Sequence, residues 1–411
     1  MKINSPISIE KIVFLALYFS IYIGFYFNED FVGGALVDYV TYKDWIELFN
    51  QNFKEHFLNY DKLGERHSPI TIWYLLIFKK IGISDTLTRL ININIILVIF
   101  YFFLKSLIIQ FPDIKKKYLI LLSCSIFLSP SLRALAIWPD SRIYGLAFFV
   151  ISIYFFLKFE KNKDLKSALL NVFFLSISSY ISPNFSLFSI FFFVKYYFYF
   201  RVSLNLLKII CLNLILAFPA FYYLFILDVM FFFNGGTSGD QINSGLFPNR
   251  FNFANKIILI SSIILFYLIP IISTKNLNLE LKHLRSYIFI IICGIFLCYF
   301  FNYDQIESTG GGIFFHLSHL LLKNNIILFS IFLISLLFLF EIIKKDLNNL
   351  GLFIIILASN IQLTIYHKYY DPMLIIMFFT LFNLSIKNID IKVLKHIFIF
   401  NVCFLIINIY F

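Results

Sequence analysis

The sequence predicts an all-α fold, a polytopic bundle of about thirteen transmembrane helices. Of the 411 residues, 60% are hydrophobic and 14% are charged, with a mean hydropathy of +0.85. Ordinary soluble domains are about half apolar and about a quarter charged. The apolar residues also form long, recurrent runs. A chain crossing a bilayer must satisfy its backbone hydrogen bonds within each segment, so these runs are expected to be helices.

The apolar runs place the expected spans and leave only short polar joints between most of them. We expect spans at residues 12–27, 87–110, 118–132, 143–157, 165–181, 183–198, 204–230, 257–273, 287–301, 326–343, 351–366, 372–386 and 394–411. The joints have no room for a soluble domain, so residues 1–411 are predicted to form one membrane domain. Its outer face has a long first loop at 28–86 and further loops at 231–256 and 302–325.

Charge sets the expected orientation and excludes one class of partner. The net charge of +11 would suggest nucleic acid in a soluble protein, but the positive-inside rule explains it here. With the N-terminus inside, 21 of the 34 lysines and arginines fall in or beside inner loops. We therefore expect a multi-pass protein of a bacterial-type inner (plasma) membrane with a cytoplasmic N-terminus, and no nucleic-acid partner.

Two further features limit the chemistry. No small-residue cleavage site follows the first apolar run, so that run is expected to be a retained anchor. All five cysteines lie in apolar runs without metal-ligand neighbours, so they read as small buried hydrophobes.

Two segments of the first outer loop are expected to lie in the membrane interface. In "KDWIELFNQNFKEHFL" (43–58), Trp45, Phe49, Phe53 and Phe57 recur every four residues, which predicts an amphipathic helix. The alternative is a soluble-loop helix that covers the bundle. "SPITIWYLLIF" (68–78) is apolar but short, and counting it as a span would invert the orientation of everything that follows.

Ionisable residues are almost absent from the middle of the expected spans and gather at their outer ends. Transporters and pumps place such residues at the bilayer midplane, so a transporter is disfavoured. "NEDFVGGALVDY" (28–39) follows the first span directly. Carboxylates there could act as a base, and nearby arginines and histidines could hold an anionic group. The candidate residues are Asp30, Asp38, Arg66, His67, Arg133, Asp140, Arg142, Arg250, His367 and Lys368.

Several of these candidates also have a purely structural interpretation. Arg133 and Arg142 could extend to lipid phosphates, and Asp140 could cap the helix that begins near Arg142. His316 and His319 are too few to predict a metal site, and "TGGGI" lacks the lysine of a phosphate-binding P-loop. The functional interpretation depends on the joint placement of the candidates on one face.

With this layout the chain resembles the GT-C superfamily of membrane glycosyltransferases, in its family-39 and aminoarabinose-transferase-like branch. "NEDFVGGALVDY" resembles the acidic motif after the first span of those proteins, and 43–58 and 68–78 resemble their interfacial helices. "SPSLRALAIWPDSRIYGLAFFVISIYFFLKF" (129–159) is similar to their third-to-fourth span junction. The acidic motif departs from the usual adjacent Asp-Glu pair followed by a tyrosine.

The resemblance implies roles for the candidate residues. Asp30, or else Asp38, would take the proton of an acceptor hydroxyl, and Arg66, Arg133, Arg142 and Lys368 would bind the phosphate of a polyprenyl carrier. A divalent cation on Asp30 and Asp140 is compatible with this chemistry, although no ligand set requires one.

The function expected on these grounds is transfer of a hexosyl or other glycosyl group, with inversion at the anomeric carbon. The donor would be a polyprenyl-phosphate-linked sugar, and the acceptor a lipid-linked or cell-envelope glycan at the outer surface. The first alternative is a Wzy-like polymerase of O-antigen or other oligosaccharide repeats; the late outer loops hold few of the arginines typical of that class. The second alternative is a polysaccharide flippase. Membrane lipids are expected partners in every case.

Overall fold

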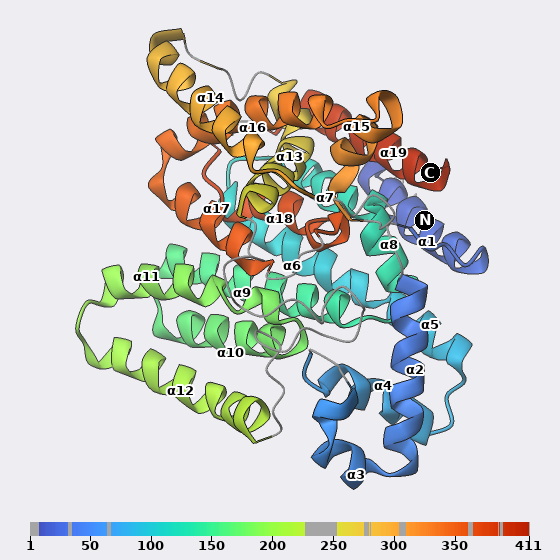
Figure 1. The fold of residues 1–411 in the computed structure, drawn as a ribbon. Helices are drawn as coiled ribbons and strands as arrows, with labels where there is room; N and C mark the ends of the chain where they lie inside the picture. Colours follow the sequence, from blue (N-terminus) through green and yellow to red (C-terminus); the bar gives the residue numbers. More distant parts are fainter. Residues whose placement is uncertain are drawn as a thin grey trace, which may run out of the picture.

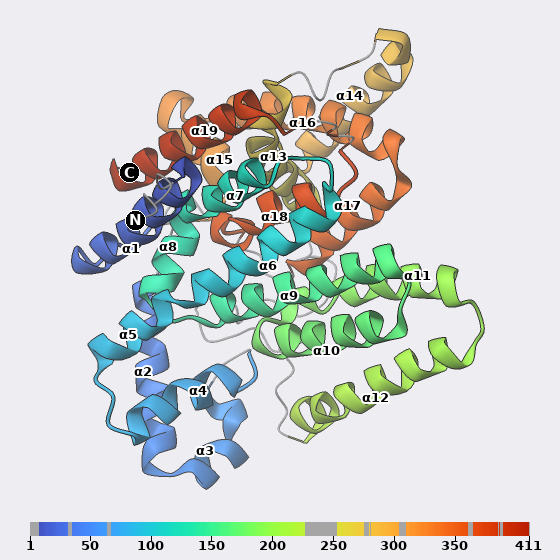
Figure 2. The same cartoon turned by 180° about the vertical axis from the view of Figure 1, so that it is seen from behind.

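The computed structural model describes residues 8–31, 35–63, 67–226, 253–274, 279, 281–303, 310–360, 365–384, 386 and 389–410. Helices make up the regular structure of this part of the chain, and the one β-bridge assigned in it joins Gly310 to Tyr366. The predicted all-α class is therefore confirmed. Figures 1 and 2 show the arrangement from opposite sides.

The helices of the first half run from the N-terminal anchor to a long exposed helix. They are α1 (Ile9–Tyr26), α2 (Ala35–Gln51), α3 (Phe53–Leu58), η1 (Tyr60–Leu63), α4 (Ile70–Lys80), α5 (Asp85–Ile93), α6 (Ile95–Gln110), α7 (Lys116–Cys124), η2 (Ser125–Leu128), α8 (Pro130–Ile137), α9 (Ser141–Asn162), α10 (Leu165–Ile181), η3 (Pro183–Phe185), α11 (Phe188–Phe200) and α12 (Leu204–Phe225).

The second half continues with α13 (Phe253–Ile272), η5 (Leu281–His283), α14 (Leu284–Tyr299), α15 (Gly312–Leu322), α16 (Ile326–Lys345), α17 (Leu347–Ser359), η6 (His367–Tyr369), α18 (Met373–Thr380) and α19 (Ile391–Tyr410). In Figure 1 these elements pack above α6 and α9, whereas α10 and α12 lie below α9, and α11 contacts α17.

The expected number of about thirteen spans is not confirmed. Among the described residues, seven helices are long and apolar enough to cross a membrane, or eight if a bent pair counts as one span. Several expected spans are shorter helices, such as α10, α14 and α17. The expected span at 372–386 contains only α18, whose eight residues are all buried in the protein. The apolar residues of this segment are therefore buried inside the protein, and α18 is too short to cross a membrane.

The bent pair interrupts the expected span at 118–132. Lys116–Leu128 and Pro130–Ile137 meet at an angle of 67°. Ser129 stands at the bend, where its Oγ accepts a hydrogen bond from Leu132 N at 3.0 Å and caps α8. Pro130 occupies the first turn of α8, where its missing N–H costs no hydrogen bond. Because α8 is fully buried, this break directs the chain through the core toward Asp140.

Segments distant in the sequence meet at two places in the bundle. At one end, segments near Asp38, Asp140, Ser182, Asn360 and Lys368 contact one another. At the other end, residues 110–114 share a pocket with segments around Phe378 and Asn383. Asp38, Asp140, Ser182 and Lys368 fall in or beside predicted outer loops, and residues 110–114 in or beside a predicted inner loop; which side of a membrane each group faces stays a prediction.

The first expected outer loop is a small helical unit, visible beside the bundle in Figures 1 and 2. Its own core contains Tyr42, Phe49, Tyr60, Ile72 and Leu75, which lie on α2, η1 and α4. The predicted helix at 43–58 is present but extends back to Ala35 and is divided at Asn52, whose side chain caps α3. Part of the predicted aromatic stripe is therefore buried against α4.

Candidate functional site

Asp38 links three distant segments at one end of the bundle. Its Oδ2 lies 3.0 Å from Lys368 Nζ and 3.6 Å from Arg142 Nη1. Asp38 lies in the first turn of α2, Arg142 in the first turn of α9, and Lys368 in η6. An acid in the first turn is favoured by the helix dipole. The Lys368 side chain is nearly buried, so its charge is held by protein groups rather than by water.

Asp140 brings a second carboxylate to the same cations. It caps α9, with Oδ1 accepting from Arg142 N at 2.7 Å and from Ser141 Oγ at 3.3 Å. Burial alone would raise the pKa of Asp140. The positive charges of Arg142 and Lys368 outweigh burial and hold the pKa below its ordinary value. His67 lies beside this turn, where its Nδ1 is 3.4 Å from Ser141 Oγ.

The Arg142 guanidinium packs on an aromatic ring. Its Cζ lies 4.5 Å from the centroid of the Tyr369 ring, and Nη2 donates to Tyr369 Oη at 3.4 Å. Cation–π contact of this kind fixes the orientation of an arginine. Among the described residues, the buried Nη1 atom has no hydrogen-bond acceptor, although it faces Asp38 across 3.6 Å. Arg142 therefore makes fewer hydrogen bonds than its five N–H donors allow.

Asp30 lies close to this cluster but is bound less tightly. Its Oδ1 accepts from Leu36 N at 3.4 Å, at the start of α2. Partial burial raises the pKa of Asp30, although much of the residue is exposed, and the Leu36 N–H and the charge of Lys368 offset this only in part. A carboxylate with a raised pKa is a stronger base than an ordinary one. Asp38, by contrast, is paired with two cations. Asp30 is thus the better placed of the two acids to accept a proton.

Arg133 lies near the same loop, but all of its hydrogen-bond donors are bound to other groups of the protein. Nε and Nη2 bind the Glu29 carboxylate, with Nη2 at 2.7 Å from Oε2. Nη1 donates to Ser20 Oγ at 2.8 Å and to Phe127 O at 3.4 Å, and Nη2 also donates to Ser20 O at 3.0 Å. An arginine has five N–H donors, and all are engaged here. Arg133 consequently has no donor left for a substrate phosphate.

This ion pair fixes the residue that precedes Asp30. Glu29 N donates to Gly24 O at 2.9 Å, and Glu29 O accepts from Trp138 Nε1 at 3.1 Å. A Cβ at Gly24 would lie 2.0 Å from Glu29 Oε2, so only glycine leaves room for the carboxylate. The chain entering the acidic loop is therefore held by both backbone groups and the side chain of Glu29.

His367 and Asp371, which lie next to Lys368 and three residues beyond it in the chain, are both buried. His367 Nε2 lies 2.8 Å from Tyr267 Oη, and burial lowers the pKa of His367 to about 3. His367 is neutral at physiological pH and unsuited to holding an anion. Asp371 Oδ2 accepts from Ser129 Oγ at 2.6 Å and from Ser131 N at 3.1 Å. It thereby joins η6 to the N-terminus of α8, where negative charge is favoured.

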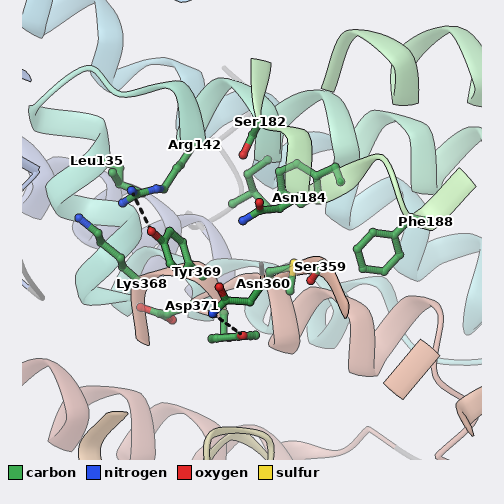
Figure 3. A pocket seen from close by; sticks show the side chains of 14 residues that line it. Leu135, Arg142, Ser182, Asn184, Phe188, Ser359, Asn360, Lys368, Tyr369 and Asp371 are labelled. Carbon is green, nitrogen blue, oxygen red and sulfur yellow. Dashed lines mark hydrogen bonds between the residues drawn. The ribbon is translucent and has the colours of Figure 1, made fainter. Parts of the chain in front are cut away.

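A cavity opens beside the ionic cluster (Figure 3). Its lining includes Arg142, Lys368 and Tyr369 together with Asn184 and Phe188. It offers about 40 Å³ to the centres of water-sized molecules. This volume has room for about three water molecules, and the cavity opens to solvent at its mouth. Arg142 and Lys368 thus border a space that a substrate group could occupy.

The structure brings together six of the ten residues predicted from sequence. The cluster contains Asp30, Asp38, His67, Asp140, Arg142 and Lys368. Arg133 pairs with Glu29 instead, and His367 with Tyr267. Arg66 and Arg250 lie outside the described residues.

Sequence reasoning missed Tyr369 and Asn184. Tyr369 directly follows Lys368 in "YHKYYDP", so its place in the chain could have identified it as a candidate site residue. Asn184 is neutral, and nothing in "ISPNFS" distinguishes it from an ordinary turn residue.

The carboxylates of the cluster are paired with cations rather than with one another. Within the described residues, no group of three or more His, Cys, Asp and Glu side chains is arranged to hold a metal ion. Asp140, one of the two acids considered for a divalent cation, already caps α9 and faces Arg142. The cluster therefore combines two cations, Arg142 and Lys368, with three carboxylates, Asp30, Asp38 and Asp140.

Comparison with protein-family models, with curated proteins and with solved structures found no match. The functional assignment accordingly depends on the geometry of the site and on the resemblance in the acidic loop.

Proposed function

We propose that the protein is an integral membrane glycosyltransferase of GT-C type. It transfers a sugar from a polyprenyl-phosphate carrier to a lipid-linked or cell-envelope glycan. The observation that carries this proposal is the cluster of Lys368 and Arg142 with Asp30 and Asp38 at one end of an apolar helical bundle. Cations suited to a phosphate thus lie beside a carboxylate suited to a hydroxyl proton.

The reaction assigns one task to each group. The acceptor hydroxyl oxygen attacks the anomeric carbon of the donor and gives its proton to Asp30. The bond between that carbon and the carrier phosphate breaks, and its electron pair stays on the phosphate oxygen. Arg142 and Lys368 stabilise the charge that develops there. Attack opposite the leaving group inverts the anomeric centre. Asp38 holds the two cations in place.

The location of the site supports a lipid-borne donor. The cluster lies where the first turns of α2 and α9 meet η6, beside loops predicted to be outer. Lipid headgroups reach such a position, and the apolar carrier chain can remain among the exposed apolar helices. The small helical unit of α2, α3 and α4 contributes Asp38 to this end. The proposal that the site faces the outer side of the membrane depends on the distribution of lysines and arginines between the loops.

Profiling lipid-linked and envelope glycans of cells with and without the protein tests this assignment. Loss of one sugar from a finished glycan supports the transferase. Accumulation of single repeat units would instead indicate a polymerase, and intact carriers retained on the inner leaflet would indicate a flippase. Either of the last two outcomes contradicts the proposal.

A further inference from the structure

The cavity of Figure 3 separates charged from neutral lining residues. Arg142, Lys368 and Asp371 lie on one side of it, and Ser182, Asn184, Ser359 and Phe188 lie on the other. Tyr369 stands between the two sides, with Arg142 packed on its ring. A single ligand filling this space would therefore place an ionic group at one end and an uncharged group at the other.

Asn184 is the larger of two polar residues at the neutral end, with Ser182, whose side chains form no hydrogen bond with a described residue. It belongs to η3, a short turn led by Pro183 that joins α10 to α11. No described residue forms a hydrogen bond with its side-chain amide. Asn360, by comparison, donates to Tyr370 Oη at 3.4 Å, and Ser359 Oγ donates to Ile356 O at 2.9 Å. An amide can both donate to and accept from a hydroxyl.

We propose that the neutral end of the cavity binds the sugar ring of the donor and that Asn184 selects an uncharged sugar. This inference rests on the proposed function, which places the carrier phosphate between Arg142 and Lys368. Hydroxyl or N-acyl groups of a neutral sugar satisfy the Asn184 amide. A sugar carboxylate or ammonium would be buried beside Asn184 and Phe188 without an opposite charge, which is unfavourable.

The test uses the full-length protein in liposomes with donors that differ only in the sugar. Polyprenyl-phosphate-linked glucose, glucuronic acid and glucosamine are compared, with a membrane lipid extract as the source of acceptor. We expect the glucose donor to have the highest kcat/KM. Asn184→Ala should raise KM for this donor about 3- to 10-fold with little change in kcat, because a neutral hydrogen bond is lost. Asn184→Asp should improve use of the glucosamine donor relative to glucose.

Ser186→Ala is the matched control, since Ser186 is half-buried in the same turn and does not line the cavity. Equal behaviour of Asn184→Ala and Ser186→Ala, or preferred use of the glucuronic acid donor, would overturn the inference while leaving transfer intact.

Binding gives a second measurement that does not require turnover. Asn184→Ala should weaken binding of polyprenyl-phosphate-linked glucose but not of bare polyprenyl phosphate, and an equal effect on both ligands would also overturn it.

Discussion

Arg133 and Arg142 lie nine residues apart, on the consecutive helices α8 and α9, yet their environments differ. Arg133 engages all five N–H donors with Glu29, Ser20 and Phe127. Arg142 stacks on Tyr369 and keeps a buried Nη1 without a hydrogen-bond acceptor among the described residues. The first arginine holds the fold together and the second faces a cavity. Residue type and proximity to a motif therefore do not identify a phosphate ligand; its unused donors do.

The largest effect is expected at the proposed base. Asp30→Asn should lower transfer about 10²- to 10⁴-fold, because the amide cannot accept the proton. Transfer by the purified variant is compared with that of wild type at equal amounts of folded protein. Asp38→Asn is the companion variant, since it removes the partner of Lys368 but leaves Asp30. If Asp38→Asn is inactive and Asp30→Asn retains activity, the base is Asp38.

The next effect concerns the Glu29–Arg133 pair. Glu29→Gln should destabilise the protein by about 3–5 kcal/mol, because it leaves the buried Arg133 charge without its partner. Unfolding in detergent measures this change. The double variant with Arg133→Met should recover part of the loss. A single variant as stable as wild type would show that the pair does not anchor the acidic loop.

Arg142 should behave in the opposite way. Arg142→Gln is expected to destabilise the protein less than Glu29→Gln, because Lys368 still compensates the buried Asp140 and the partly exposed Asp38. Transfer should nevertheless fall about 10- to 100-fold, the effect of losing a charged hydrogen bond to the phosphate. The same two assays are used for Arg133→Met. If Arg133→Met impaired transfer without destabilising the protein, the distinction between the two arginines would be lost.

The pH dependence of transfer should reflect the titration of both Asp30 and Lys368. The pKa of Asp30 is raised by burial, and Asp30 must be ionised, so activity should be lost as pH falls through that raised pKa. The pKa of Lys368 is lowered, chiefly by burial and also by Arg142. Activity should therefore fall as pH rises through the lowered pKa of Lys368. Lys368→Arg should remove this alkaline limb, because arginine stays charged; an unchanged limb would rule out Lys368 as its cause.

The sequence predicted which segment ends meet, but not how each side chain is used. Charge alternation and apolar runs placed Asp38, Asp140 and Lys368 on one face, and the structure brings them together. The pairing of Arg133 with Glu29 depends on the path of α8 and on the space left by Gly24, which no local pattern encodes. The short buried α18 was mistaken for a span because burial in protein and burial in lipid favour the same residues.

Transfer by purified protein in liposomes tests the central claim most directly. Wild-type protein supplied with a labelled polyprenyl-phosphate sugar and a membrane lipid extract should move the label to a new acceptor and release polyprenyl phosphate. Lys368→Met should abolish this reaction, and Ser186→Ala should not affect it. Absence of transfer by folded wild-type protein with every sugar donor tried, or full activity of Lys368→Met, would contradict the account.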